Sequence, residues 1–208
     1  MSHYCCGCDQ SLLPTPESLL CDNCFNRLHF LKSPAHFPRL HKIYFERAFS
    51  LLAYEGDLLK WIRDWKYNRH LHLSRLFLEF FDKSDFDFSE CHYIVPVPLH
   101  FFRRWKRGFN QAAVLALDLG RKWEIPILHH GIKRIRYGKR QVEQNLEERL
   151  ENVKNIFAPG RSIGKVADKN ILLIDDVTTT GATLNACAKV LKQGKARSVT
   201  VLTLARTL

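Results

Sequence analysis

The segment Ile171-Leu172-Leu173-Ile174-Asp175-Asp176-Val177-Thr178-Thr179-Thr180-Gly181-Ala182-Thr183 decides the fold class of this chain of 208 residues. Four consecutive aliphatic side chains are typical of a strand that is buried on both faces of a parallel sheet. They end at two adjacent carboxylates, so we expect the acids at the carboxyl end of the strand. The hydroxyls and the glycine that follow predict the start of a helix, whose apolar stripe is Leu184, Cys187, Ala188 and Leu191.

The start of this helix is predicted to hold a phosphate group. Its unpaired backbone N–H groups and the positive end of its dipole point at one spot, and Gly181 lets the backbone approach closely. Carboxylates at Asp175 and Asp176 suit a ligand that also carries hydroxyls, or a magnesium ion between ligand and protein. A ribose 5-phosphate unit fits both requirements. An ordinary polar helix cap is the alternative, but it explains one polar residue and not six within nine positions.

The same segment resembles the phosphoribosyl-pyrophosphate (PRPP) motif of the type I phosphoribosyltransferases, in which Asp-Asp precedes Thr-Thr-Gly-x-Thr. In that family the acid pair engages the ribose 2- and 3-hydroxyls, and the following loop holds the 5-phosphate. Magnesium is expected with PRPP. The resemblance implies that the ribose 5-phosphate site consists of Asp175, Asp176, Val177, Thr178, Thr179, Thr180, Gly181, Ala182 and Thr183.

The N-terminal region carries five of the seven cysteines, and four of these form two Cys-x2-Cys pairs. Four thiolates at this spacing are typical of a closed tetrahedral zinc site, so we expect a structural metal. Disulfides are the alternative in a secreted protein, but residues 1–20 lack the basic head and apolar stretch of a signal peptide. We therefore expect a cytoplasmic protein. The expected zinc ligands are Cys5, Cys8, Cys21 and Cys24.

The composition favours one core domain with a small appendage. Hydrophobic residues make up 46% of the chain, which is enough for a core. No apolar run approaches the roughly 18 residues that span a membrane. We expect a zinc finger over residues 1–30, a linker containing prolines over 31–42, and a phosphoribosyltransferase-like domain over 43–208.

Strands that alternate with helices predict a parallel α/β sheet. A sheet-like pattern covers residues 43–54, and an amphipathic helix follows with Leu58, Trp61, Ile62 and Trp65 inward and Lys60, Arg63 and Lys66 outward. Further strands are expected at 93–99 and 198–204, with a helix at 112–119. The expected fold is a parallel-sheet type I phosphoribosyltransferase fold with a small N-terminal four-cysteine zinc finger.

A second resemblance lies in Pro96-Val97-Pro98-Leu99, followed by the segment from Arg103 to Gln111 that contains Arg-Gly-Phe-Asn-Gln. It is similar to the pyrophosphate loop and signature of the ComF proteins. ComF and its relative GntX also place a zinc finger and a short linker in front, so the resemblance covers essentially the whole chain. It implies a pyrophosphate loop of Pro98, Leu99, Arg103, Arg104 and Arg107. Its implied catalytic residues are Asp175, Asp176 and Arg107.

The charge of the chain suggests a nucleic-acid partner. The formal net charge is +11, and residues 100–140 contain eleven Lys or Arg against two acids. Basic segments with aromatic residues are typical of sequence-tolerant single-strand binding, although a pyrophosphate site also requires Arg and Lys. ComF relatives are implicated in natural transformation, in which single-stranded DNA is handled after it crosses the inner membrane. The expected DNA-binding residues are Arg103, Trp105, Lys106, Lys139 and Arg140.

Three functions stay open on these patterns. The first is a ComF-type protein of DNA uptake that binds single-stranded DNA and PRPP or ribose 5-phosphate. The second is an active magnesium-dependent phosphoribosyltransferase, in which a nitrogen acceptor displaces pyrophosphate from C1 of the ribose. The third is an adaptor whose zinc finger docks a DNA translocase or helicase. No residue stands out in the sequence as a general base, and the acceptor is not identified.

Overall fold

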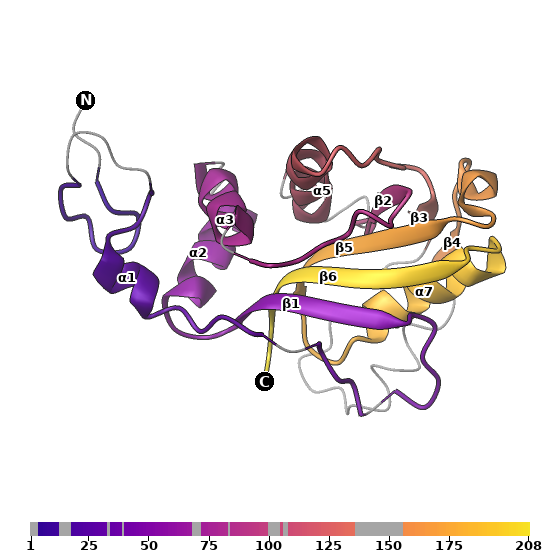
Figure 1. The fold of residues 1–208 in the computed structure, drawn as a ribbon, viewed down its shortest axis with the longest axis horizontal. Coiled ribbons are helices and arrows are strands. Elements are labelled where there is room, and N and C mark those ends of the chain that lie inside the picture. The colour runs from indigo at the N-terminus through magenta and orange to yellow at the C-terminus, as the bar shows by residue number, and fades with distance from the viewer. Residues whose placement is uncertain are drawn as a thin grey trace.

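The computed structural model describes residues 4–12, 18–32, 34–38, 40–67, 72–82, 84–99, 105, 108–135 and 156–208. Its centre is a four-stranded parallel sheet in the order β1-β6-β5-β2 (Figure 1). The strands are β1 (Arg47–Ala53), β6 (Ser198–Arg206), β5 (Asn170–Thr178) and β2 (Tyr93–Pro96). The parallel α/β sheet expected from the sequence is therefore confirmed.

Helices cover both faces of this sheet (Figure 1). On one face lie α2 (Gly56–Tyr67), α3 (His72–Asp82) and α5 (Gln111–Lys122), and on the other lies α7 (Ala182–Gln193). Successive side chains of a strand point to opposite faces, and β5 follows this rule. Leu172 and Ile174 pack in the cluster with α3 and α5, whereas Ile171 and Leu173 pack in the cluster with α7. The aliphatic run thus fills both layers of the core.

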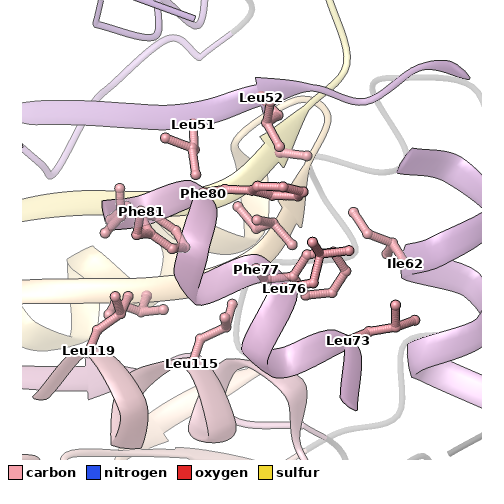
Figure 2. Packing of buried hydrophobic residues seen from close by; sticks show 14 of the residues in the cluster. Leu51, Leu52, Ile62, Leu73, Leu76, Phe77, Phe80, Phe81, Leu115 and Leu119 are labelled. Carbon is pink, nitrogen blue, oxygen red and sulfur yellow. The ribbon is translucent and has the colours of Figure 1, made fainter. Parts of the chain in front are cut away.

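The larger core cluster centres on α3. Figure 2 shows Phe80 and Phe81 of this helix between Leu51 of β1 and Leu119 of α5, and all four side chains are buried. The sequence patterns considered above did not point to α3. Its buried residues nevertheless follow the helical period, so this periodicity was the signal that the sequence analysis missed: Leu73, Leu76, Phe77, Phe80 and Phe81.

The remaining described elements are short. They are α1 (Asp22–Asn26), the antiparallel pair β3 (Ile132–Arg134) and β4 (Phe157–Pro159), and the 3-10 turn η1 (Ile163–Val166). Every helix in the described part of the chain is too short or too polar to span a membrane.

Strand β5 is longer than the sequence analysis expected. It continues beyond Ile174 through both acids to Thr178, because β6 pairs with it as far as Arg206. The acids, which were expected at the carboxyl end of the strand, therefore lie among its last four residues.

The segment that leads into β1 packs against the sheet. Phe30 forms an antiparallel bridge with Leu52, the Leu31 N–H donates to the Leu51 carbonyl at 2.9 Å, and Phe37 is buried in the α7 cluster. Residues 30–32 and 34–37 thus lie along the edge of the sheet and towards α7.

Candidate functional site

The loop between β5 and α7 has the backbone geometry of an anion site. Gly181 is the N-cap of α7 and has φ 74°, which is the left-handed region that side chains disfavour. A Cβ at this position would lie 2.7 Å from Phe37 Cδ1, so the neighbouring ring also excludes a side chain. In the loop, Thr180 Oγ1 accepts a hydrogen bond from the Ala182 N–H at 3.4 Å. The first turn of α7 consequently presents N–H groups next to hydroxyl side chains.

The segment before β1 fixes the first turns of α7. Asn185 Oδ1 accepts from the Tyr44 N–H at 2.8 Å, and Asn185 Nδ2 donates to the Lys42 carbonyl at 2.7 Å. Phe37 and Phe45 pack edge to face with ring centroids 5.8 Å apart. The loop is therefore held from one side by residues that lie about 140 positions earlier in the chain.

The two adjacent acids of β5 point to opposite faces of the sheet. Asp176 continues the side of Leu172 and Ile174, and Asp175 continues the side of Ile171 and Leu173. Backbone N–H groups bind both carboxylates, since Asp176 N–H donates to Asp175 Oδ1 at 2.9 Å and Val177 N–H donates to Asp176 Oδ1 at 2.6 Å. Both carboxylates are therefore fixed in orientation. Asp175 faces the α7 layer, and Asp176 faces the layer of α2, α3 and α5.

Asp176 faces α2, where Lys66 forms an ion pair with it. Lys66 Nζ lies 2.9 Å from Asp176 Oδ1, and the two side chains are only 15% and 12% exposed. The sequence analysis placed Lys66 on the outward face of this helix, which is wrong. The amphipathic pattern carried no signal for the contact, because it joins residues 110 positions apart.

Asp175 faces the α7 layer and has an unusual acidity. Burial raises its pKa to about 7, and the neighbouring Asp176 carboxylate contributes to the increase. The hydrogen bond from the Asp176 N–H, Lys66 and Arg134 of β3 lower the pKa. A carboxyl group that titrates near neutral pH at the end of a strand is a frequent feature of functional sites.

The predicted pyrophosphate loop starts beside the acids. The Val97 N–H donates to the Ile174 carbonyl at 2.8 Å, so Pro98 and Leu99 leave the sheet next to the acidic end of β5. Asn110 Nδ2 donates to the Val97 carbonyl at 3.0 Å, and the Phe109 ring packs on Trp65 of α2 with centroids 6.2 Å apart. Phe109 and Asn110 of the Arg-Gly-Phe-Asn-Gln signature thus contact α2 and Val97, the residue at which the predicted pyrophosphate loop leaves β2.

Several predicted site residues cannot be placed. The Lys and Arg residues of the predicted pyrophosphate and DNA sites lie outside the described residues: Arg103, Arg104, Lys106, Arg107, Lys139 and Arg140. Trp105 is described, and its side chain is 79% exposed. It is therefore not a core residue.

The four cysteines predicted as ligands come together. Their sulfur atoms all lie within 4.8 Å of one another. Cys21 Sγ is 3.6 Å from Cys5 Sγ and 3.7 Å from Cys8 Sγ, close to the ~3.8 Å edge of a tetrahedron with metal–sulfur bonds of about 2.3 Å. A Cβ on Gly7 would lie 2.7 Å from Cys24 Sγ, so only glycine fits this turn. The group could hold a metal ion such as zinc.

The thiol acidities suit a metal site. Burial raises the pKa of Cys5, but N–H donors from Cys21, Gly7 and Cys8 outweigh it and lower the pKa to about 6. The Gly7 and Cys21 N–H groups each lie 3.3 Å from Cys5 Sγ. Burial raises the pKa of Cys24 to about 12, with a further increase from the adjacent cysteines. Cys5 is thus a thiolate at neutral pH, the form that binds metals, whereas Cys24 requires a cation to ionise.

The four-cysteine centre is part of the main core. Cys5 and Cys24 are buried in the same cluster as Trp61 of α2 and Phe80 of α3. Glu79 of α3 accepts hydrogen bonds from Ser18 Oγ at 3.1 Å and from the Leu19 N–H at 3.0 Å. Figure 1 shows the N-terminal segment with α1 on the α2 and α3 side of the molecule.

Comparisons with known proteins agree with this arrangement. Residues 106–207 match the family described as "Phosphoribosyl transferase domain". Competence protein F of Haemophilus influenzae is 39% identical over 54% of this chain and 49% of its own length. DNA utilization protein YhgH of Escherichia coli strain K12 is 36% identical over 55% of this chain and 49% of its own length. The chain spans about half the length of these curated relatives.

One solved structure to which part of this chain is similar is the glutamine PRPP amidotransferase from B. subtilis complexed with ADP and GMP. It covers 63% of this chain and 25% of its own chain, with 18% sequence identity and a TM-score of 0.40.

Proposed function

Because the chain belongs to the ComF family of competence and DNA utilization proteins, we propose that it acts in the uptake of DNA. In this proposal the phosphoribosyltransferase-fold domain binds single-stranded DNA and also PRPP or ribose 5-phosphate. The four-cysteine centre holds one structural zinc ion, since four thiolates leave no open position for a substrate.

The geometry that carries the sugar-phosphate proposal is the end of β5 followed by α7. Fixed carboxylates at Asp175 and Asp176 lie a few residues from the left-handed Gly181 and the N–H groups of the first helical turn. Carboxylates accept hydrogen bonds from ribose hydroxyls, and helix N–H groups donate hydrogen bonds to phosphate oxygens. Magnesium bound to PRPP would find oxygen ligands of the type it prefers at the same acids.

The DNA proposal rests on charge and on one exposed ring. The formal net charge is +11, and Trp105 is 79% exposed within the basic segment. Exposed aromatic side chains in basic surroundings provide stacking surfaces for unpaired bases, with phosphate contacts that depend strongly on salt.

The proposal is tested by two titrations of the purified protein. Calorimetry with ribose 5-phosphate, and with PRPP and magnesium, should show binding that is lost in the variant Asp175→Asn/Asp176→Asn. Fluorescence anisotropy with a labelled oligothymidine should show binding that weakens steeply between about 50 and 200 mM salt. Unchanged sugar-phosphate binding in the folded variant would contradict the assignment of the acids, and absence of oligonucleotide binding would contradict the DNA role.

A catalytic function is the second candidate, and the match of residues 106–207 to a phosphoribosyl transferase domain favours it. In this reaction a nitrogen nucleophile forms a bond to C1 of the ribose, and pyrophosphate leaves with the bonding electrons. Release of pyrophosphate from PRPP and magnesium, measured with ammonia and other nitrogen acceptors, tests it. Release that is unaffected by Asp175→Asn/Asp176→Asn would count against catalysis at this site.

A further inference from the structure

A groove of about 500 Å³ lies along α2, next to the acid pair. It is lined mainly by three cationic side chains, two tyrosines and one leucine: Lys60, Arg63, Lys66, Tyr54, Tyr67 and Leu59. Among the described residues that line it, none is acidic. The groove therefore has the chemistry of a site for an anionic ligand that also offers flat apolar surfaces.

Two of the three cations of this groove lack a carboxylate partner among the described residues, whereas the third, Lys66, pairs with Asp176. Among the described residues, the exposed cations Arg27, Arg47 and Lys122 are each paired with a carboxylate. Lys60 and Arg63 form no ion pair with any carboxylate in this part of the chain.

The spacing of the cations suits a chain of phosphates. From Lys60 to Lys66 the helix rises about 9 Å at 1.5 Å per residue. This length is on the scale of two adjacent phosphates of a single strand, which matches the two cations Lys60 and Arg63. The side chains of Tyr67 and Leu59 are 46% and 42% exposed, so both are available for contact with bases.

Lys66 connects the groove to the sugar-phosphate site. It lines the groove, and its Nζ also lies 2.9 Å from Asp176 Oδ1. The preceding Trp65 packs on Phe109 near the start of α5. A ligand at the Lys66 end of the groove therefore lies next to the ion pair with Asp176.

We propose that this groove on α2 binds the phosphodiester backbone of single-stranded DNA and leads the strand to the acid pair. The proposal rests on the proposed function, because it names the place at which the strand lies. Lys60 and Arg63 contact the phosphates, and Leu59 and the ring of Tyr67 contact the bases.

The test compares two variants that lose the same charge. Lys60→Gln/Arg63→Gln removes two cations of the groove and leaves Lys66 in place. The control Arg161→Gln/Lys165→Gln removes two exposed cations at η1, which precedes the amino end of β5 and is thus distant from the acids. Binding of a labelled oligothymidine is measured by anisotropy between about 50 and 200 mM salt. Melting temperature and ribose 5-phosphate affinity serve as checks of folding and of the neighbouring site.

The groove variant should bind the oligonucleotide at least about tenfold more weakly, with a salt slope smaller by roughly 1.4, that is, two contacts at about 0.7 each. The control should stay within about twofold of the parent, because its charges lie outside the path of the strand. Equal binding by the two variants would overturn the proposal that the strand lies in this groove, while the proposed function would remain intact. A parent protein that binds no oligonucleotide would instead overturn the proposed function.

Two measurements on the unmodified sequence complete the test. Bound oligothymidine should protect Lys60 from acetylation while Lys165 stays reactive, and equal reactivity would overturn the proposal. Inorganic pyrophosphate at matched ionic strength should leave the oligonucleotide bound. Displacement by pyrophosphate would show that the groove is a site for a free polyphosphate. That result would also overturn the proposal.

Discussion

Lys66 of α2 and Asp176 of β5 lie 110 residues apart in the sequence, yet Lys66 Nζ is 2.9 Å from Asp176 Oδ1. Both side chains are largely buried, so solvent screens this pair much less than a surface pair. The contact ties the last turn of α2 to the strand that carries the acid pair. It also gives the two adjacent acids different partners, which a strand achieves by turning them to opposite faces.

Replacing Lys66 by Met should affect both stability and ligand binding. Asp176 would remain in a largely buried position without its cation, and we expect a loss of about 1–3 kcal/mol in the free energy of unfolding. Lys66 also lowers the pKa of Asp175, so the variant should shift the pH profile of ribose 5-phosphate binding to higher pH. Denaturant unfolding and calorimetry across pH measure these effects.

Lys60→Met is the matched control, since it removes a cation from the exposed side of the same helix. It should leave stability and the pH profile unchanged. If Lys66→Met behaves in the same way, the ion pair has no role in holding the acids.

The raised pKa of Asp175 predicts opposite pH trends for ligand binding and for stability. Its carboxylate form accepts hydrogen bonds from ribose hydroxyls, so affinity for ribose 5-phosphate should rise as pH increases through about 7. In the folded protein the protonated form is favoured over a wider range than in the unfolded chain. The free energy of unfolding should therefore fall as pH increases from about 4 to about 7.

Asp175→Asn tests both trends, because the amide keeps the shape and does not ionise. This variant should no longer bind ribose 5-phosphate. Its free energy of unfolding should also decrease less than that of the parent between about pH 4 and about pH 7, because the titration of Asp175 is absent. Unfolding experiments at several pH values measure the second effect. A pH dependence of stability identical to that of the parent would refute the assignment of the titration to Asp175.

Gly181→Ala should destabilise the phosphate loop for two reasons. A side chain disfavours φ 74° by about 1–2 kcal/mol, and its Cβ would lie 2.7 Å from Phe37 Cδ1. We expect a lower melting temperature and weaker ribose 5-phosphate binding. The double variant Gly181→Ala/Phe37→Ala removes the contact between the added Cβ and the ring but keeps the strained backbone angle. Comparing it with Phe37→Ala therefore separates the backbone effect from the steric effect.

The control for this prediction is Gly164→Ala. A Cβ at Gly164 meets no atom within 4 Å, and its backbone is not in the left-handed region. This change should be close to neutral. Equal effects of the two substitutions would mean that the loop tolerates a side chain at Gly181.

The four-cysteine centre should contain one zinc ion per chain, and its loss should weaken the main core. Cys5 lies in the same buried cluster as Trp61 and Phe80, so Cys5→Ser should release the metal and expose part of that cluster. We expect a loss of at least about 2 kcal/mol, or roughly 4–8 °C in melting temperature for a chain of this size. Metal analysis and thermal unfolding measure both.

Cys6→Ser is the matched control, because Cys6 is outside the group of four sulfur atoms. It should keep the metal. Protein purified without chelator that contains no metal would rule out the zinc site. An unchanged melting temperature in Cys5→Ser would show that the centre folds independently of the core.

Trp105→Ala should weaken single-stranded DNA binding by ~1–3 kcal/mol if a base stacks on the ring. Its side chain is 79% exposed, so the melting temperature should not change. Trp105→Phe keeps an aromatic face and should retain most of the affinity. Anisotropy at constant salt measures the difference, and equal binding by all three proteins would exclude stacking at this position.

The sequence by itself determined the local features of this protein. Strand β5, the apolar stripe of α7 and the four cysteines were predictable, because each depends on a pattern within a short segment: a run of four aliphatic residues, the helical period, and Cys-x2-Cys pairs. Residues of α2 that face the core were predictable for the same reason.

Only the tertiary structure decided how these parts meet. Pairing with β6 extends β5 through the acids and so turns Asp175 and Asp176 to opposite faces. The ion pair of Lys66, the contact of Phe37 with Gly181 and the packing of Cys5 in the main core join residues far apart in the chain. Local periodicity carries no information on such contacts, because burial and Coulomb energy depend on which distant surfaces the folded chain brings together.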